Sequence, residues 1–563
     1  KIMNIYDINK VIKILKENNK LRFASKGDKI VEINNKVIDN SLEYLTTFEV
    51  PEEWKDLEYK DNQKLTFNES INLLKGDTLP VSSFIKNKEG IFEGTTTKEE
   101  KRNIAEEVPC WISENCIECN QCAFSCPHGV IRPFLLDKKD SKVESIPSLL
   151  PKDNEFTIGI NYEECTGCGV CTLACPGKLG KKALEMVPNK DKENNFEYLL
   201  KNNVNDKYQS NLLTVKNVSF KEPKFEYSGA CAGCGETPYI TNLTRVFNDN
   251  LMIANATGCS SIYSGSVPSM PYSIPWASSL FEDNTEYGYG ILQGINIKRD
   301  KIKKYMKEYP RNKLFKKWIE NMDNYDICKE VKENIDYKKH PYLNDMKDYI
   351  LPKQLWVLGG DGFAYDIGYG GLDHVLSKKD NINILVLDTE VYSNTGGQSS
   401  KSSNIGSVAS FTSNGKDNYK KDLARIAMCY PHVYVASVNI GYNKEQYLKA
   451  IKEASLHNGP SLIIAYSPCI EHGIKTGMQH SQSNGYLATK CGYFLTFRYN
   501  PDTKKFSLDS KEPEFDKYED YLMTENRFAS LVRKDKERAR LLLEEQKQWA
   551  IDRYNYYKKI SEE

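Results

Sequence analysis

The chain has 563 residues, and its 77 basic and 77 acidic side chains give a formal net charge of zero. A chain of this length is expected to form about three or four domains. The even charge balance argues against electrostatic binding to nucleic acid. No run approaches the ~18 consecutive apolar residues of a membrane-spanning helix, which argues against an integral membrane protein.

Sixteen cysteines are the clearest excess in the composition, and eleven of them fall between Cys110 and Cys234. Because the N-terminus carries no secretion signal, these cysteines favour metal binding or redox chemistry over a disulfide framework. The sequence opens at Lys1 without an initiator Met, so we expect it to be part of a longer polypeptide.

The first part of the chain divides into three segments. Residues 1–54 combine a predicted helix at Asp7–Asn18 with a strand-like alternation at Lys29–Ile33, and we interpret them as the tail of an upstream α/β domain. Residues 55–95 are polar and indicate a linker or small domain. In residues 96–205 cysteine replaces the apolar core, a pattern typical of a small domain held together by inorganic clusters.

Residues 206–563 have the pattern of a larger α/β domain. Four strand-like runs alternate with helical stretches, which predicts a mostly parallel sheet flanked by helices. The runs are Leu355–Leu358, Ile382–Leu387, Val433–Val438 and Leu462–Tyr466. The final charged segment predicts a helix on the surface or on a partner subunit. Its predicted anchors within Glu525–Glu563 are Leu531, Leu541, Leu542 and Trp549.

One motif occurs twice: the spacing C-x2-C-x2-C-x3-C-P begins at Cys116 and again at Cys165. Bacterial-type ferredoxins bind two 4Fe–4S clusters with this spacing, and the fourth cysteine of each run reaches the other cluster. Zinc is the weaker interpretation, because zinc sites use paired C-x2-C knuckles. We therefore expect a ferredoxin-like α+β domain with two clusters. One would take Cys116, Cys119, Cys122 and Cys175, and the other Cys165, Cys168, Cys171 and Cys126.

Two later motifs indicate a cofactor. Gly360-Asp-Gly-Phe363 follows a predicted strand and precedes a predicted helix, and an oxygen-rich loop, Thr389–Asn394, follows the next strand. A carboxylate in a glycine turn and such a loop can together hold Mg²⁺ and a diphosphate, as in thiamine diphosphate sites. A lone Gly-Asp-Gly turn is often only structural. The pair Cys231-Ala-Gly-Cys234 is by itself ambiguous between a zinc knuckle, a redox pair and half of a cluster site.

Together these segments resemble the C-terminal half of a single-chain pyruvate:ferredoxin (flavodoxin) oxidoreductase. The resemblance covers essentially the whole chain. It rests on the two cysteine runs and on the segments Ile131–Leu136, Cys231–Tyr239, Asn255–Tyr263, Ser279–Asn284 and Asp388–Gln398. It implies that residues 206–563 form the thiamine diphosphate-binding domain. It also implies that residues 96–205 form an inserted ferredoxin-like domain.

The resemblance also implies a third 4Fe–4S cluster, close to the cofactor, on Cys231, Cys234, Cys259 and Cys469. Spacing alone does not find Cys469. The four remaining cysteines match no motif and are expected to be buried structural thiols: Cys110, Cys328, Cys429 and Cys491. Three histidines near the motifs are expected to be ordinary polar residues, although the first could tune a cluster by hydrogen bonding: His128, His472 and His480.

For the cofactor, the resemblance implies Mg²⁺ ligands from Asp361, Thr389 and the carbonyl of Val391. It implies that Asn394 lies beside the reacting carbon of thiamine and orients the substrate, which makes it the predicted catalytic residue. The full set of predicted cofactor contacts is Glu236, Cys259, Gly360, Asp361, Gly362, Phe363, Thr389, Glu390, Val391, Tyr392, Ser393 and Asn394.

The implied activity is oxidative decarboxylation of pyruvate with coenzyme A to acetyl-CoA and CO₂, with electrons passing through three clusters to ferredoxin or flavodoxin. The implied partners are an upstream pyrimidine-binding half, fused or separate, and a second copy in a homodimer. The implied compartment is the cytoplasm or a hydrogenosome-type organelle. The segment Pro271–Trp276 lacks a loop that the family usually carries there.

Two alternatives stay open at this point. One is a sister oxidoreductase that acts on another 2-oxo acid. The other is a subunit that only relays electrons, which the Gly360–Phe363 and Thr389–Asn394 motifs oppose because a relay has no use for a diphosphate site. Thiamine diphosphate binding would discriminate the relay from the enzyme.

Overall fold

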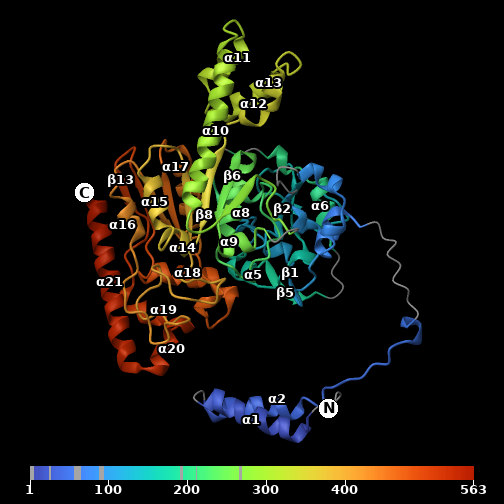
Figure 1. Ribbon diagram of the computed structural model, residues 1–563, viewed down its shortest axis with the longest axis vertical. Helices are drawn as coiled ribbons and strands as arrows, with labels where there is room; N and C mark the ends of the chain where they lie inside the picture. The colour runs from blue at the N-terminus through green and yellow to red at the C-terminus, as the bar shows by residue number, and fades with distance from the viewer. Residues whose placement is uncertain are drawn as a thin grey trace. The chain divides into compact units, whose positions relative to one another are not determined.

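The computed structural model describes residues 6–24, 27–55, 65–87, 94–189, 194–208, 210, 212–265 and 269–563. The chain divides into two compact units, Lys1–Phe67 and Asn68–Glu563 (Figure 1). None of the helices within the described ranges has both the length and the apolar character that crossing a bilayer requires.

The first unit contains two contacting helices, α1 (Ile8–Phe23) and α2 (Asp28–Asn40), and a short 3-10 turn at Glu52–Trp54. The side chain of Asn19 in α1 is buried and donates to the carbonyl of Val31 in α2 at 3.0 Å. This contact joins the two helices into a hairpin.

The predicted helix near the N-terminus is therefore confirmed, whereas the predicted strand at Lys29–Ile33 is wrong because this segment lies in α2. Val31, Asn34, Asn35 and Ile38 are less exposed than the other residues of this segment, and they recur with helical spacing. So short an apolar run is ambiguous between strand and helix, and only the longer period resolves it.

The second unit is built around an eight-stranded sheet with strand order β13-β12-β10-β11-β9-β8-β6-β7. The strands from β10 to β7 in this order are parallel, and β12 and β13 add antiparallel pairs at one edge. The mostly parallel sheet and its four predicted strands, β8 to β11, are confirmed. The bounds are β6 (Leu251–Ala256), β7 (Trp276–Ser279), β8 (Gln354–Gly359), β9 (Asn383–Asp388), β10 (Tyr434–Val438), β11 (Ser461–Tyr466), β12 (Phe497–Asn500) and β13 (Lys505–Leu508).

Both faces of this sheet are buried. Leu355 and Val357 of β8 belong to one apolar core, and Trp356 and Leu358 belong to the core on the opposite face. This alternation is what a strand covered on both sides by helices requires. Helices along the sheet segments are α7 (Val215–Ser219), α8 (Thr237–Phe247), α9 (Cys259–Ile262), α14 (Asp361–Ala364), α15 (Tyr369–Leu376), α16 (Leu423–Ala427), α17 (Lys444–Leu456) and α18 (Ser481–Lys490).

Helix α10 (Asn284–Lys307) runs past the end of the sheet and carries a small helical arm (Figure 1). The arm has its own core, which includes Ile302, Phe315 and Trp318. Its other helices are α11 (Lys313–Glu320), α12 (Tyr325–Asn334) and α13 (Pro341–Asp345).

The C-terminal segment forms α19 (Tyr518–Leu522), α20 (Asn526–Lys534) and α21 (Lys536–Glu562). Leu531 and Leu542 are buried as predicted, and Trp549 is half-buried. Leu541 is wrong as an anchor, since it is 54% exposed. Its neighbours Leu542 and Leu543 are buried instead, and three consecutive helical residues cannot all face the same side.

The cysteine-rich segment forms two small antiparallel sheets, in agreement with the predicted α+β domain. In one, β1 (Glu107–Trp111) pairs with β5 (Leu184–Pro188). In the other, the order is β2 (Ile131–Leu136), β4 (Glu155–Ile160) and β3 (Ile146–Pro147). The helices here are α4 (Gln121–Ser125), α5 (Val170–Ala174) and α6 (Phe196–Asn202), and upstream lie α3 (Phe67–Asn72) and 3-10 turns at Gly76–Thr78 and Val81–Asn87.

Candidate functional site

Four loops meet at one edge of the large sheet, because β11, β9, β8 and β6 are parallel neighbours and end on the same side. The loops that follow these strands carry Cys469, Thr389, Asp361 and Cys259. Residues separated by up to two hundred positions therefore become neighbours. Sequence spacing could not find Cys469, because its place depends on β11 lying beside β9.

These loops line a cavity of about 270 Å³, which we call the cofactor cavity. All predicted cofactor contacts except Glu390 line it. Four further residues line it that were not predicted, although all four lie within the segments of the resemblance: Thr257, Gly258, Phe281 and Thr395.

The predicted Mg²⁺ ligands lie on this cavity. Asp361 is buried; its Oδ2 accepts a hydrogen bond from Ser400 Oγ at 2.5 Å, and its Oδ1 has no partner. Burial, and then the charge of Asp388, raise the pKa of Asp361 well above its usual value. Thr389 Oγ1 donates to the carbonyl of Val391 at 3.0 Å. A buried, unpartnered carboxylate oxygen beside a hydroxyl and a carbonyl is an oxygen donor set that suits Mg²⁺.

Two other predicted residues differ in their surroundings. Glu236 is buried, accepts a hydrogen bond from the Tyr263 hydroxyl at 2.8 Å, and has its pKa raised to about 7 by burial. Asn394 is exposed, so its amide is available to a molecule in the cofactor cavity.

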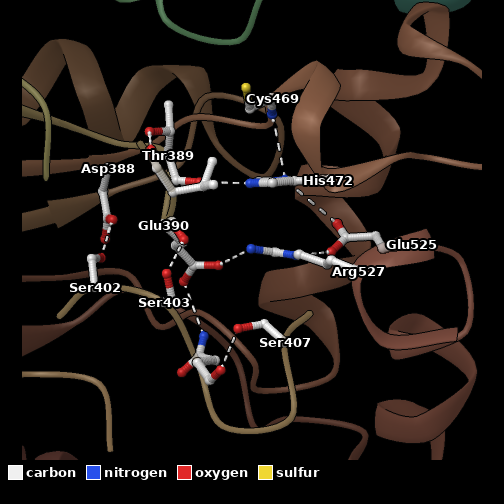
Figure 2. Close-up of polar contacts among 12 residues, drawn as sticks. Asp388, Thr389, Glu390, Ser402, Ser403, Ser407, Cys469, His472, Glu525 and Arg527 are labelled. Carbon is white, nitrogen blue, oxygen red and sulfur yellow. Dashed lines mark hydrogen bonds and ion pairs between the residues drawn. The ribbon is translucent and has the colours of Figure 1, made fainter. Parts of the chain in front are cut away.

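Glu390 differs from the other predicted contacts, since it does not line the cofactor cavity and its carboxylate points toward Arg527 (Figure 2). Its backbone is left-handed, with φ 60°, and its side chain is buried. The carboxylate accepts a hydrogen bond from Lys420 Nζ at 2.7 Å and forms an ion pair with Arg527 Nη1 at 2.9 Å. Burial alone would raise the pKa of Glu390, but Lys420 and then Arg527 lower it to about 2. Glu390 therefore anchors the loop rather than contacting the cofactor.

The third set of cysteines gathers next to the cofactor cavity. The pKa of Cys259 is raised by burial, then by Glu236, and then by the neighbouring Cys469, Cys234 and Cys231. The loop of Cys231 and Cys234 lies close to the loop of Cys469. This approach depends on Gly235, whose N–H donates to the carbonyl of Pro468 at 3.1 Å. A Cβ on Gly235 would lie 2.5 Å from that carbonyl oxygen, so a larger residue would push the loops apart.

The two cysteine runs combine across the chain as predicted from ferredoxins. One small cavity, which we call cavity A, is lined by Cys116, Cys119, Cys122 and Cys175. A second small cavity, which we call cavity B, is lined by Cys165, Cys168, Cys171 and Cys126. Each cavity thus takes three cysteines from one run and the fourth from the other.

The chemistry of these cavities fits iron–sulfur clusters. Burial raises the pKa of Cys165 to about 12, so a thiolate there needs compensation by bound cations. Backbone N–H groups already point at sulfur, from Gly167 to Cys165 at 3.4 Å and from Ala183 to Cys175 at 3.3 Å. Among the described residues, no three His, Cys, Asp or Glu side chains come together as ligands of a single metal ion.

Two buried donors face sulfur at the walls of these cavities: Trp111 Nε1 toward Cys116 at cavity A, and Thr166 Oγ1 toward Cys168 at cavity B. Such donors suit the sulfide and thiolate acceptors of a cluster. His128 is buried and its Nδ1 lies 3.3 Å from the carbonyl of Ser228. Burial lowers the pKa of His128 to about 4, so the ring is neutral. Because the carbonyl can only accept, Nδ1 carries the single proton and Nε2 at cavity B is an acceptor.

The cysteine sets follow one another in space. The N–H of Gly233, between Cys231 and Cys234, hydrogen-bonds to the thiol of Cys168 in cavity B. Burial raises the pKa of this thiol, and the hydrogen bond from Gly233 lowers it. At the other end of cavity B, the pKa of Cys171 is raised mainly by burial. The charge of Cys122, which belongs to cavity A, also contributes to this rise. The order is therefore third set, cavity B, cavity A.

The other predicted cysteines and histidines are placed as follows. Cys328 and Cys491 are buried as expected, but Cys429 is exposed and Cys110 is half-buried, so the prediction is wrong for these two. Cys429 lies just beyond the short helix α16, where no core covers it. The histidines near the third set also differ: His480 is half-buried, whereas His472 is fully buried.

Comparison with known proteins agrees with this geometry. Residues 115–179 match the family described as a 4Fe–4S dicluster domain, and residues 348–465 match the C-terminal TPP-binding domain of thiamine pyrophosphate enzymes. Residues 67–105 match a domain of unknown function. The fold class and the presence of thiamine- and iron–sulfur-type domains are thereby confirmed.

Several relatives align with the whole chain. The pyruvate:ferredoxin oxidoreductase of Moorella thermoacetica is 42% identical, with 100% of this chain and 52% of the relative covered. A pyruvate-flavodoxin oxidoreductase of Enterobacter agglomerans is 39% identical over the same shares. A pyruvate dehydrogenase [NADP(+)] of Cryptosporidium parvum is 36% identical over 100% of this chain and 35% of the relative.

These relatives confirm the resemblance found in the sequence. The chain is related along its whole length to pyruvate:ferredoxin and pyruvate:flavodoxin oxidoreductases, and it spans about half the length of the first two relatives.

Proposed function

We propose that the chain forms the cofactor-and-cluster half of an enzyme that converts pyruvate and coenzyme A to acetyl-CoA and CO₂ and passes the two electrons on one at a time. The observation that carries this proposal is Cys259, which lines the cofactor cavity and also belongs to the third cysteine set. A cofactor site that shares a wall with a cluster site suits a reaction in which decarboxylation feeds electrons directly into a cluster.

In this proposal Asp361, Thr389 and the Val391 carbonyl hold Mg²⁺, and the Gly360–Phe363 turn with the Thr389–Asn394 loop holds the diphosphate. Thiamine diphosphate, when bound, supplies the carbanion stabilisation that decarboxylation needs. Asn394 orients the substrate, because its exposed amide lines the cofactor cavity. Glu236, whose pKa burial raises to about 7, is only partly ionised near neutral pH and lies against the cofactor without adding a full negative charge.

The proposed electron route follows the order of the cysteine sets. Electrons enter the cluster on Cys231, Cys234, Cys259 and Cys469, continue to the cluster in cavity B, and leave from the cluster in cavity A. The contact from Gly233 to Cys168 and the proximity of Cys122 to Cys171 support this order.

The proposed partners are an upstream half that completes the cofactor site, a second copy in a homodimer, and ferredoxin or flavodoxin as acceptor. We propose the cytoplasm or a hydrogenosome-type organelle as the compartment. The Cryptosporidium relative carries NADP(+) in its name, so reduction of ferredoxin, flavodoxin and NADP⁺ by the full-length enzyme would separate the acceptors. Comparing kcat/KM for pyruvate with that for other 2-oxo acids would test the sister-enzyme alternative.

The decisive experiment is Asp361→Ala in the full-length protein. We expect loss of Mg²⁺-dependent thiamine diphosphate binding by calorimetry, with the visible absorption of the clusters retained. The exposed Asp417→Ala is the matched control and should bind like the wild type. Iron and sulfide should each approach about 12 per chain, from three clusters of four. Retained cofactor affinity, or a zinc-dominated metal content, would overturn the proposal.

A further inference from the structure

The loop that holds the diphosphate and the loop that carries Cys469 touch each other. They follow the neighbouring strands β9 and β11, where Tyr466 is in register with Asp388. The first residue after β11, Ser467, donates its N–H to the carbonyl of Asp388 at 3.0 Å. The two loops therefore leave the sheet side by side, and two side chains then join them.

The first of these side chains is Ser393. Its Oγ lies 3.1 Å from the sulfur of Cys469, close enough for a hydrogen bond between hydroxyl and sulfur. As a cluster ligand Cys469 is a thiolate, which cannot donate, so Ser393 must be the donor. Ser393 also lines the cofactor cavity. One hydroxyl thus belongs both to the cofactor loop and to the surroundings of a proposed cluster ligand.

This hydroxyl has a second acceptor within reach. Ser393 Oγ lies 3.4 Å from the carbonyl of Val391, which is the proposed Mg²⁺ ligand. A hydroxyl has a single proton to donate, so Val391 and Cys469 compete for it. When Mg²⁺ occupies the Val391 carbonyl, that competition is weakened and the Ser393 proton is left to the sulfur.

The second side chain is His472, which is fully buried between the two loops (Figure 2). Its Nδ1 faces the backbone N–H of Cys469 at 3.4 Å, and its Nε2 lies 2.6 Å from the carbonyl of Thr389. Because a backbone N–H can only donate, Nδ1 is the acceptor and Nε2 carries the proton that Thr389 accepts. A neutral imidazole in this tautomer ties the cluster loop to the Mg²⁺ loop.

Charged side chains lie behind the imidazole. Glu525 Oε1 lies 3.8 Å from Nδ1 of His472, which is a contact and not a hydrogen bond because Nδ1 carries no proton in this tautomer. Glu525 pairs with Arg527 at 2.6 Å. Arg527 also pairs with Glu390, at the start of the diphosphate loop. All of these side chains are buried, so the distance between the two loops is set by a closed set of polar contacts.

We propose that Ser393 tunes the proximal cluster according to the loading of the Mg²⁺–diphosphate site, and that His472 is the positioning residue that keeps the two loops at the distance this requires. The proposal rests on the proposed function, since it takes Cys469 as a cluster ligand. A hydrogen bond to a ligand sulfur stabilises the more negative reduced cluster and so raises its potential. Loading the cofactor site would therefore make the proximal cluster a better electron acceptor when electrons are about to arrive.

The test is a redox titration of the full-length protein, with the proximal cluster followed by EPR before and after addition of Mg²⁺ and thiamine diphosphate. In the wild type we expect the potential to rise on loading. Ser393→Ala should lower the potential of the loaded protein and diminish this rise, while the other two clusters are unchanged. Ser393→Thr keeps the hydroxyl and should restore both properties.

A second pair of variants tests the positioning residue. His472→Phe should weaken thiamine diphosphate binding about 10–100-fold, as loss of an outer-shell partner does, and should diminish the loading-dependent rise. His472→Gln keeps a donor and an acceptor and should recover part of both. The matched control is His480→Phe, in the same segment but only half-buried and paired with Ser483, which should behave like the wild type.

The outcomes separate this proposal from the proposed function. If Cys469→Ser loses one cluster but Ser393→Ala titrates like the wild type, the coupling is wrong and the function stands. If Cys469→Ser keeps all of its iron, the proximal cluster assignment fails and the coupling fails with it. No rise in the wild-type potential on loading, or an equal effect of His480→Phe and His472→Phe, would also overturn the coupling.

Discussion

The cysteine-rich region and the cofactor region organise their sites in opposite ways. Around cavities A and B, cysteines take positions that apolar side chains hold elsewhere, with Cys122, Cys126, Cys165 and Cys171 inside the core itself. Around the cofactor cavity, the sheet is covered by two large apolar cores, and the loop that follows β9 is anchored by buried ion pairs behind it. We therefore expect the first region to depend on the proposed clusters for its stability, whereas the second is preformed by protein contacts.

The largest effect should come from removing iron. With a chelator under reducing conditions, the segment from β1 to β5 should lose its amide protection, because it would keep only buried thiols around two empty cavities. Strands β8 and β9 should stay protected. Hydrogen exchange measured by mass spectrometry checks both regions in one sample. Equal protection of β1 and β8 in the iron-free protein would contradict the comparison.

The next prediction concerns the crossing of the two cysteine runs. Cys175→Ser lies in the second run but should remove the cluster of cavity A, so about 4 of about 12 iron atoms should be lost. Cys126→Ser, in the first run, should remove the cluster of cavity B instead. EPR of the reduced protein distinguishes the two, and the exposed Cys429→Ser serves as the control. Loss of the same cluster in both variants would show that the runs do not cross.

A smaller effect is expected from Glu390→Gln in the preformed region. The change leaves Lys420 and Arg527 buried without their shared carboxylate, which should lower the free energy of unfolding by about 3–5 kcal/mol. The matched control is Glu514→Gln, which breaks the exposed pair with Lys490 and should cost about 0–1 kcal/mol. Urea unfolding followed by far-UV circular dichroism measures both. Equal losses would mean that the network behind the loop does not stabilise it.

The same contrast explains what could be predicted from the sequence. Cavities A and B need cysteines only a few residues apart, and the left-handed positions repeat with them, at Glu118 and Asn120 in one run and Gly167 and Gly169 in the other. Spacing therefore predicts both cysteine sets. The parallel sheet was also predictable, because its buried strands form continuous apolar runs.

The contacts of Glu390 and His472 were not predictable in the same way. The Glu390 carboxylate meets Arg527, more than one hundred residues away, and His472 reaches Thr389 across two strands. These pairings depend on the strand order and on the docking of α20, neither of which leaves a local signal. The prediction of a strand in the N-terminal hairpin was wrong for another reason, since the run at Lys29–Ile33 fits the helical and the strand period equally well.

The smallest effect concerns the surface where electrons are proposed to leave. Cys175 and Gly177 line cavity A, and the next residue but one, Leu179, is 97% exposed. Lys178 and Lys181 flank it and are exposed, whereas Lys182 is held by the carbonyls of Leu173 and Cys175. An apolar tip ringed by positive charge suits an acidic electron carrier, because unlike charges speed association.

Reversing the two free charges, Lys178→Glu with Lys181→Glu, should raise the KM for an acidic carrier about tenfold at low salt and less at high salt. The turnover with a small viologen dye should not change, because a dye needs no docking surface. Lys301→Glu with Lys304→Glu, on the exposed side of α10, makes the same change in net charge and is the control. The nearby acidic residues Glu114 and Glu185 are unchanged in both double variants. An equal KM in the two would mean that overall charge, and not this loop, attracts the carrier.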